Sequence, residues 1–424
     1  MVDACKSNQI INHDYLKNKL SGLCQEIRER AALPLDRAVT LPAEIYTDQD
    51  FFQFEQQKIL RSGWQCVAHV SQIPEAGSYL AIDLLDEPLL VVRQQDLSIK
   101  ILSRICAHRA TDIMHECFGK AQTGTLKRFS CPYHAWSYDL NGQLRAAAGM
   151  QDVKDFNKSD YQLSSYRSEV WEGFVFINMD GKAEPIAEQL KEMQSRISPW
   201  TSKEYEVAIS LEWECEYNWK VLIENWVESY HHMAIHYDTL QPVAPTQTYW
   251  TEPEHPHFIH CHIPLSKLAK EQIINELNGG ESVADFQVIA GLTEEQQTQW
   301  QLYLAYPNFM FVTMRDRTLW YRVLPIDANR CKLHTMVLVT KESKLAENYQ
   351  EKINLEIEAV NAFHGQDMQV NTAVHKGLLS GRAIKGRLSI LEEPIWLIQR
   401  YLAARTLDNF PQVSNFTVIQ PDTV

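Results

Sequence analysis

Residues 218–236 read NWKVLIENWVESYHHMAIH, and the interpretation of the whole chain starts from this stretch. Trp219, Leu222 and Trp226 recur at steps of three and four residues, which is the spacing of one apolar face of a helix. The polar side chains of the stretch gather towards its C-terminal end: Asn225, Glu228, His231, His232 and His236. This concentration of metal-binding and acid–base side chains predicts a functional site.

Helical geometry brings some of these side chains together and separates others. At about 100° per residue, Asn225, Glu228 and His231 fall within one third of the helix circumference. In an unbroken helix His236 would lie about 140° from His231, so both can reach one metal ion only if the helix bulges or ends between them. Two imidazoles and a carboxylate with open positions suit Fe(II) and O2 chemistry. From this stretch alone, a buried helix with hydrogen-bonded histidines is the alternative.

The composition argues against several classes of protein. The 424 residues are 45% hydrophobic and 22% charged, and the net charge of −14 disfavours nucleic acid or an anionic membrane as a main partner. No apolar run approaches the roughly 18 residues of a membrane span, and residues 1–20 lack the apolar core of a signal peptide. Nine cysteines without repeated spacing do not form a disulfide framework. We therefore expect a cytoplasmic protein of two or three domains.

The N-terminal part of the chain changes from helical patterns to strand patterns. Tyr46–Ser62 predicts a helix with Thr47 as its N-cap. From Trp64 onward, runs rich in Val, Ile, Leu or aromatic residues predict a small antiparallel β domain: WQCVAHV, SYLAIDLL, EPLLVVRQ and SIKILSRI.

This β domain contains two loops that each supply one cysteine and one histidine. Cys106 and His108 belong to CAHR, and Cys131 and His134 belong to CPYH. Cys2His2 is a zinc ligand set, but zinc fingers keep the two cysteines together and the two histidines together. One cysteine and one histidine per loop suit a two-iron cluster with thiolates on one iron and imidazoles on the other, which is Rieske ligation.

The two loops and their flanks, CAHR and CPYHAWSYDLNGQL, resemble the Rieske domain of ring-hydroxylating, non-haem iron oxygenases. The intervening loop is longer than is usual in that family and carries His115 and Cys117, which we interpret as surface residues. The resemblance implies four ligands of a Rieske [2Fe–2S] cluster: Cys106, His108, Cys131 and His134.

The resemblance extends to the opening stretch, because family members share an ENW-like sequence followed by a carboxylate, YH and a second histidine five residues later. It implies that His231 and His236 bind a mononuclear Fe(II), with Asn225 and Glu228 as catalytic residues beside them. Glu228 would link this iron to the Rieske site of a neighbouring subunit. Aromatic-ring dioxygenases usually have Asp at this position, whereas Glu resembles the members that act on quaternary ammonium compounds such as carnitine.

The C-terminal half returns to helices and strands. Residues 266–278 and 293–303 predict helices, and FMFVTMR, LWYRVLP and CKLHTMVLV predict strands of a sheet. Lys344–Leu379 predicts a long helix whose inner stripe turns polar at mid-length, at His364 and Asp367. The resemblance implies Asp367 as the third iron ligand, with His364 as its rival.

Two further groups of side chains have alternative interpretations. His260 and His262, in the histidine-rich run 255–262, would share one face of a strand, where they could bind a second metal ion or line a pocket. Four aromatic residues could cage a trimethylammonium group or belong to the core: Tyr249, Trp250, Trp320 and Tyr321.

The resemblance implies an α+β fold in three parts. These are an N-terminal arm (1–45), a small antiparallel β Rieske domain with a preceding helix (46–168), and a catalytic domain with an antiparallel sheet packed against helices (169–424). Such a protein is a terminal oxygenase that takes electrons from a separate NAD(P)H-dependent reductase or ferredoxin and uses O2 to hydroxylate a small organic substrate, with a quaternary ammonium compound favoured. The family's arrangement implies a homotrimer, because the two iron centres of one subunit are too far apart for fast electron transfer.

Three alternatives remain at this point. One is an aromatic-ring dioxygenase or demethylase of the same family. The second is a Rieske electron carrier without oxygenase activity, and the third is a zinc-binding structural protein.

Overall fold

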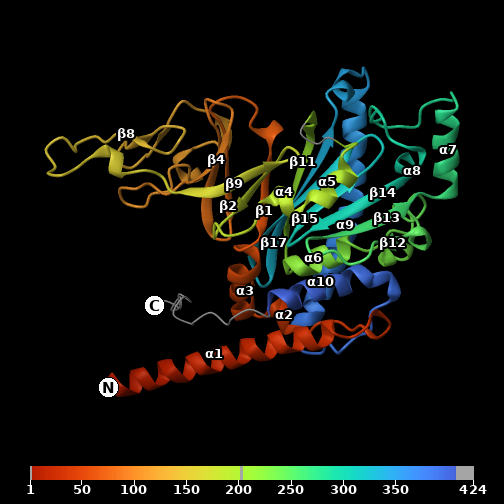
Figure 1. The fold of residues 1–424 in the computed structure, drawn as a ribbon, viewed down its shortest axis with the longest axis horizontal. Helices are drawn as coiled ribbons and strands as arrows, with labels where there is room; N and C mark the ends of the chain where they lie inside the picture. The colour runs from red at the N-terminus through yellow and green to blue at the C-terminus, as the bar shows by residue number, and fades with distance from the viewer. Residues whose placement is uncertain (1, 201–203, 407–424) are drawn as a thin grey trace.

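The computed structural model describes residues 2–200 and 204–406, with side chains from residue 15 onward. Within these residues the chain forms two seven-stranded sheets and a small three-stranded sheet. Figure 1 shows the strands of the first half at the left, the strands of the second half at the right, and helices below and behind them. The expected α+β fold is confirmed.

The first seven-stranded sheet is antiparallel throughout, in the order β1-β10-β9-β4-β3-β2-β5. Its strands are β1 Trp64–His69, β2 Ser78–Leu84, β3 Glu87–Arg93, β4 Ile99–Ser103, β5 Thr123–Thr125, β9 Ser165–Trp171 and β10 Phe174–Asn178. The small sheet beside it contains β6 Phe129–Ser130, β7 Ser137–Tyr138 and β8 Leu144–Ala146. A domain boundary after residue 168 would cut β9, so we propose that the first domain extends to Asn178, where β10 ends.

The second seven-stranded sheet is also antiparallel, in the order β11-β17-β16-β15-β14-β13-β12. Its strands are β11 Glu206–Cys215, β12 Trp250–Thr251, β13 Phe258–Pro264, β14 Gln299–Ala305, β15 Phe309–Thr313, β16 Thr318–Asp327 and β17 Arg330–Val339. From β12 to β17 each strand pairs with the next one along the chain, whereas β11 pairs with β17.

Helices enclose the second sheet and join it to the N-terminal arm. They are α1 Val2–Ala31, α2 Glu44–Thr47, α3 Gln49–Glu55, α4 Ile186–Gln189, α5 Lys191–Ile197, α6 Trp219–Trp226, α7 Lys267–Leu277, α8 Glu294–Gln297, α9 Tyr349–Leu379 and α10 Glu393–Arg405. The long helix α9 contacts both α6 and β11, and α1 lies along the base of the molecule against α10 (Figure 1). None of the described helices combines the length and the apolar character needed to cross a membrane.

An aromatic cluster joins the two sheets. Phe174 of β10 packs edge-on against Phe309, Phe311 and Trp320, with ring centroids 5.1–5.5 Å apart. Edge-to-face pairs of buried rings stabilise such contacts beyond their area alone, by about 1 kcal/mol each. The two sheets therefore form one packed body.

Three details of the helix predictions are wrong. Residues 293–303 form the short helix α8 and then strand β14, because pairing with β13 and β15 overrides the helical pattern. Tyr46–Ser62 is broken at Asp48, whose extended backbone ends α2. The N-cap is also Asp48 rather than Thr47, because the Asp48 carboxylate accepts a hydrogen bond from the Phe51 N–H.

Candidate metal centres

The helix that opens the central stretch stops before the histidines. Asn218 caps α6 by accepting a hydrogen bond from the Lys220 N–H, and the helix ends at Trp226. A single 3-10 turn follows at Tyr230–Met233. The sequence required the helix to bulge or end between His231 and His236; the helix instead ends before both residues, and the non-helical segment after it lets His231 and His236 approach the same point.

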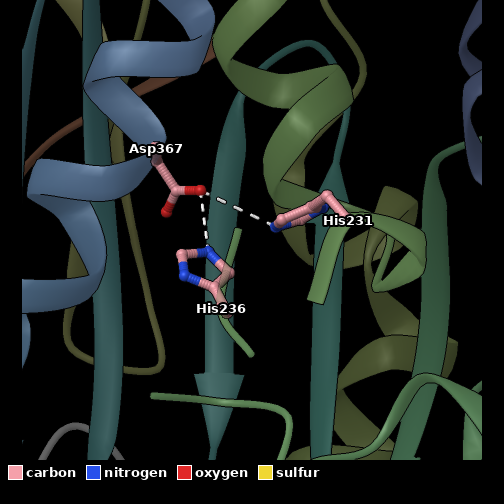
Figure 2. Close-up of side chains that lie close together, drawn as sticks. All are labelled: His231, His236 and Asp367. Carbon is pink, nitrogen blue, oxygen red and sulfur yellow. Dashed lines mark hydrogen bonds and ion pairs between the residues drawn. The ribbon is translucent and has the colours of Figure 1, made fainter. Parts of the chain in front are cut away.

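His231, His236 and Asp367 converge on one position (Figure 2). Asp367 Oδ1 lies 2.9 Å from His236 Nε2 and 3.6 Å from His231 Nε2. Asp367 projects from α9, whereas the two histidines come from the segment after α6. The three donor atoms lie within 4.8 Å of one another, which is close enough to bind a single ion.

Neighbouring side chains orient both imidazoles so that Nε2 of each ring is directed at Asp367. Glu228 Oε1 accepts a hydrogen bond from His231 Nδ1 (2.6 Å), and Gln366 Oε1 accepts one from His236 Nδ1 (2.7 Å). Because Nδ1 donates in each ring, Nε2 keeps its lone pair for a metal. Burial opposes ionisation of Asp367, but the adjacent imidazoles, His236 first among them, outweigh it, so the pKa of this carboxyl lies below its usual range. Two imidazoles and an ionised carboxylate fit Fe(II).

The other two histidines near this point have protein partners. His364 Nε2 lies 3.0 Å from the Thr335 hydroxyl, and its Nδ1 is 4.0 Å from Asp367. His232 Nδ1 donates to the Ala244 carbonyl (2.9 Å). Burial lowers the pKa of both rings to about 4, so both are neutral at pH 7. The geometry favours Asp367 over His364 as the third ligand.

Asn225 and Glu228 face a second hollow on the other side of His231. Both line a cavity of about 570 Å³, and Asn225 accepts a hydrogen bond from Asn371 of α9 (3.2 Å). Glu228 is buried and contacts His231 directly. Glu228 therefore lies between the three donors and this cavity, whereas Asn225 touches none of the three donors in the described contacts.

The three donor residues line a cavity of about 180 Å³. Its aromatic walls are Trp226, Trp300, Tyr321 and Phe363. Arg317 and Glu356 also line it, and they form an ion pair of 3.0 Å. Arg317 makes two further ion pairs, with Asp285 (3.2 Å) and Asp316 (2.9 Å), so one guanidinium faces three carboxylates. The cavity therefore combines aromatic rings with the Arg317–Glu356 ion pair, and Asp285 and Asp316 contact Arg317 from outside the cavity lining.

The four-residue aromatic cage considered above does not form. Only Tyr321 of the four lines the 180 Å³ cavity. Trp320 is its neighbour on β16 and points to the opposite face, into the core between the sheets. Trp250 stacks on His262, and Tyr249 is buried with its hydroxyl bonded to the Val227 carbonyl.

Three residues of the cavity and its surroundings were missed from the sequence. Glu356 lies three residues after Ile353 and four before Val360, so helical spacing placed it on the inner stripe of α9. Because glutamate is usually exposed, the burial of Glu356 was not expected. Arg317 and Gln366 carry no motif, and nothing in the sequence identified them.

The two Rieske-like loops adopt the same backbone path. In each loop the cysteine N–H donates to the carbonyl five residues later, at 2.9 Å for Cys106 and 2.8 Å for Cys131. In each loop the cysteine carbonyl accepts from an alanine N–H four residues later, and both alanines, Ala110 and Ala135, have positive φ (54° and 58°). Two matching loops face each other, as a cluster held symmetrically by two loops requires.

The side chains of these loops fit a cluster. Both cysteines are buried, and the rings of His108 and His134 lie 4.7 Å apart. His108 stacks on Trp136, and its Nδ1 is buried without a hydrogen-bond partner, as expected for an atom that binds metal. His115 and Cys117 are exposed, in agreement with their interpretation as surface residues.

Two protein-family models match the chain. The Rieske [2Fe-2S] domain matches residues 63–157, and the ring hydroxylating alpha subunit (catalytic domain) matches residues 202–407. Together they cover most of the chain. A Rieske domain and this catalytic domain imply a [2Fe–2S] cluster and a mononuclear non-haem iron.

Proteins named as carnitine or choline monooxygenases are similar to this chain. The carnitine monooxygenase oxygenase subunit of Acinetobacter pittii is 32% identical over 198 residues, which are 46% of this chain and 52% of that protein. This chain thus matches about half the length of such relatives. The chloroplastic choline monooxygenase of Arabidopsis thaliana is 26% identical over 86% of this chain and 82% of its own length.

Solved structures share the fold. The quaternary ammonium Rieske monooxygenase CntA, in complex with an inhibitor, has a TM-score of 0.75 at 23% identity and covers 89% of this chain and 98% of its own. Naphthalene 1,2-dioxygenase from Rhodococcus sp. has a TM-score of 0.72 at 18% identity, over 91% and 98%.

Proposed function

We propose that this chain, which belongs to the Rieske oxygenases with a ring-hydroxylating alpha catalytic domain, is the terminal oxygenase of a multicomponent enzyme. The observation that carries the proposal is the convergence of His231, His236 and Asp367 below a 180 Å³ cavity, in a chain that also holds the paired Cys-His loops. An electron carrier has no use for the first set of donors. A zinc-binding structural protein would be colourless, so the visible bands of an iron–sulfur cluster distinguish it from this proposal.

Each residue has a defined task in this proposal. When bound, the cluster supplies single electrons and the mononuclear iron supplies the place where O2 reacts with the substrate. Cys106, Cys131, His108 and His134 would hold the cluster. His231, His236 and Asp367 would hold the iron on one face, while Glu228 and Gln366 orient the two imidazoles. The aromatic cavity walls exclude water and position the substrate.

We infer a homotrimer with electron transfer between subunits. The strand β8, which follows the second Cys-His loop, lies at the far left of Figure 1, whereas α6 and α9 lie on the other side of the molecule. Glu228 contacts His231 on one side and lines the 570 Å³ cavity on the other, so a partner's Rieske domain seated there would complete the path. A solved structure of a quaternary ammonium Rieske monooxygenase with a similar fold (TM-score 0.74, 23% identity) is described as giving insight into inter-subunit electron transfer in that protein. The electron donor would be an NAD(P)H-dependent reductase or a ferredoxin.

A quaternary ammonium compound is the substrate class that the cavity favours. Glu356 places a carboxylate in the cavity wall, Asp285 and Asp316 balance the charge of Arg317 beside it, and the aromatic rings offer faces to a cation. The names of the carnitine and choline monooxygenases agree with this inference. An aromatic-ring dioxygenase or a demethylase is the second candidate, supported by the largely apolar walls.

A cytoplasmic location is proposed on the state of the cysteines. The eight cysteines whose side chains are described are all unpaired, which suits a reducing compartment.

The test combines iron content with a matched pair of substrates. The purified chain should hold about three irons, two in the cluster and one at the mononuclear site. With a reductase and NADH, trimethylammonium compounds should stimulate O2 uptake and give a hydroxylated or dealkylated product. Analogues with carbon in place of the charged nitrogen should not. About two irons and no O2 uptake would indicate an electron carrier, and preference for the neutral analogues would indicate the second candidate.

A further inference from the structure

A second group of metal-binding side chains lies on the other face of β13. His260 and His262 are alternate residues of this strand, and Ile263, which points the opposite way, lines the 180 Å³ cavity. Glu252 follows β12, and its N–H donates to the His260 carbonyl (2.9 Å). Apart from the iron site, this is the one set of three donors within single-ion distance among the described residues.

The distances between donor atoms match those of a zinc site. Glu252 Oε1 lies 3.3 Å from His262 Nε2 and 3.9 Å from His260 Nδ1. Ligand atoms at 2.0–2.1 Å from a tetrahedral zinc lie roughly 3.3 Å from one another. The Glu252–His262 pair is already at this separation, the Glu252–His260 pair must close by about 0.6 Å, and the two imidazole nitrogens lie within 4.8 Å of each other.

Both imidazoles are already oriented for this role. Gln301 accepts a hydrogen bond from His260 Nε2 (3.0 Å), and Gln299 accepts one from His262 Nδ1 (3.2 Å). Each ring thus gives its N–H to a glutamine on β14 and turns its other nitrogen towards Glu252, as metal-binding histidines do. Stacking on Tyr303 and on Trp250 keeps the rings in place.

The electrostatic surroundings keep these rings neutral. Burial lowers the pKa of His260 to about 3 and lowers the pKa of His262 below its usual value. Neutral imidazole is the form that binds a metal ion. No proton has to leave either ring at pH 7.

The guanidinium of Arg196 lies where the ion would bind. Arg196 Nη1 donates to His260 Nδ1 (2.8 Å) and lies 3.7 Å from Glu252 Oε1. The Arg196 side chain is about one-third exposed (32%) and borders a surface cavity of about 220 Å³, which gives it room to swing out. Arg196 is therefore a built-in competitor rather than a permanent occupant.

We propose that Glu252, His260 and His262 form a zinc-binding site, separate from the iron site, in which Arg196 and Zn²⁺ exclude each other. The ion would tie the end of β12 to β13 at the edge of the second sheet. Its open fourth position would face the 220 Å³ cavity, where a water molecule can bind.

The experiment adds Zn²⁺ to the protein with its cluster and iron in place. Zinc and iron per chain are measured after removal of free ions, and zinc affinity is measured by competition with a chromophoric chelator. We expect one zinc per chain with no loss of iron, and an X-ray absorption spectrum with two imidazole ligands. Arg196→Met should tighten binding by about tenfold or more, because the competing cation is gone, whereas Glu252→Gln and His262→Gln should weaken it by at least about tenfold.

His255→Gln is the matched control, since His255 lines the same 220 Å³ cavity but is outside the three donors. It should bind zinc like the wild type. The tighter binding expected of Arg196→Met is a gain that misfolding cannot imitate. Zinc uptake matched by an equal loss of iron, no uptake by the wild type, or unchanged affinity in Arg196→Met and Glu252→Gln would each overturn the proposal.

Discussion

Glu228 holds His231 through Nδ1, the nitrogen that faces away from Asp367. Because this carboxylate orients a ligand without being one, Glu228→Ala should keep close to full iron at both centres. The reductase should still reduce the cluster, and electrons should fail to pass onward. Single-turnover kinetics checks this: after addition of substrate and O2, the reduced cluster of the variant should stay reduced.

Two conservative changes separate length from charge at Glu228. Glu228→Asp withdraws the oxygens by about 1.5 Å, the length of one carbon–carbon bond, and Glu228→Gln keeps the length without the charge. Both should slow reoxidation of the cluster without loss of iron. Rapid reoxidation of the cluster in Glu228→Ala would contradict the bridging role of Glu228. Loss of the mononuclear iron would show that Glu228 is a direct ligand.

Glu356 is an acidic residue in the cavity wall, and its ion pair with Arg317 holds it there. If the substrate is a cation, Glu356→Gln should raise its KM by about tenfold, equivalent to about 1.4 kcal/mol of binding, with a smaller effect on kcat. Steady-state kinetics with a trimethylammonium substrate and its neutral carbon analogue provides the measurement. An equal rise in KM for both compounds would show a general disturbance of the cavity instead of charge recognition.

At the scale of elements, a buried ion pair joins α6 to α3. Lys220 Nζ lies 2.7 Å from Glu55 Oε2, and neither side chain is exposed. Burial raises the pKa of Glu55 and lowers that of Lys220, so each depends on the other to stay charged. Lys220→Met should destabilise the fold by about 3 kcal/mol, since it leaves an unpaired buried carboxylate. Lys220→Met with Glu55→Met should recover most of the loss, as measured by denaturant unfolding; additive losses would contradict the coupling.

His334 lies where three strands are in contact, and its titration should make the stability of the folded protein depend on pH. His334 on β17 accepts a hydrogen bond from Arg322 on β16 (3.0 Å) and lies 3.3 Å from Glu212 on β11. Burial and the charge of Arg322 lower its pKa to about 3. Below the unfolded value of about 6.5, the unfolded chain binds a proton that the folded chain does not, so stability falls as the pH falls.

Between pH 7 and pH 5 this effect should cost about 2 kcal/mol. His334→Gln can still accept from Arg322 and has no proton to gain. Its thermal midpoint should therefore drop by several degrees less than that of the wild type over the same interval. Equal drops in the two proteins would show that His334 does not titrate in this way.

The elements and the metal donors differ in how far the sequence revealed them. The strands β1–β4 and β15–β17 were predicted because their apolar runs are short and bounded by turns. The two Cys-His loops and the pair His231 and His236 were visible because their donors lie a few residues apart. Asp367 needed the family resemblance, since the strands β12 to β17 lie between it and the histidines in the sequence and must fold before it approaches them.

The cavity wall could not be predicted for the same reason. Arg317 and Glu356 meet through contact of α9 with the loop before β16, and no local pattern records that contact. The strand β14 was mistaken for a helix because its pairing with β13 is also long-range. Functional residues that lie close together in one segment can be predicted from the sequence. A site whose residues come from distant segments can be recognised only once the fold is known.

For the whole molecule, electron transfer between subunits predicts complementation. A Cys131→Ala chain keeps the iron site without a cluster, and a His236→Ala chain keeps the cluster without the iron. In trimers assembled at random from equal amounts, about one quarter of the interfaces would pair a working cluster with a working iron site in the required order. Coexpressed chains should therefore reach about one quarter of wild-type activity, and each variant alone should be inactive. Transfer within one subunit would leave the mixture inactive.

The position of Asp367 on α9, beyond the last strand of the second sheet, also orders events during synthesis. A ribosome completes the two Cys-His loops at His134 and reaches Asp367 about 230 residues later. At roughly 5–20 residues per second, this interval lasts tens of seconds. The nascent chain can receive its cluster while the third donor of the iron site does not yet exist. Cells that assemble clusters but lack free iron would then accumulate chains that accept electrons and consume no oxygen.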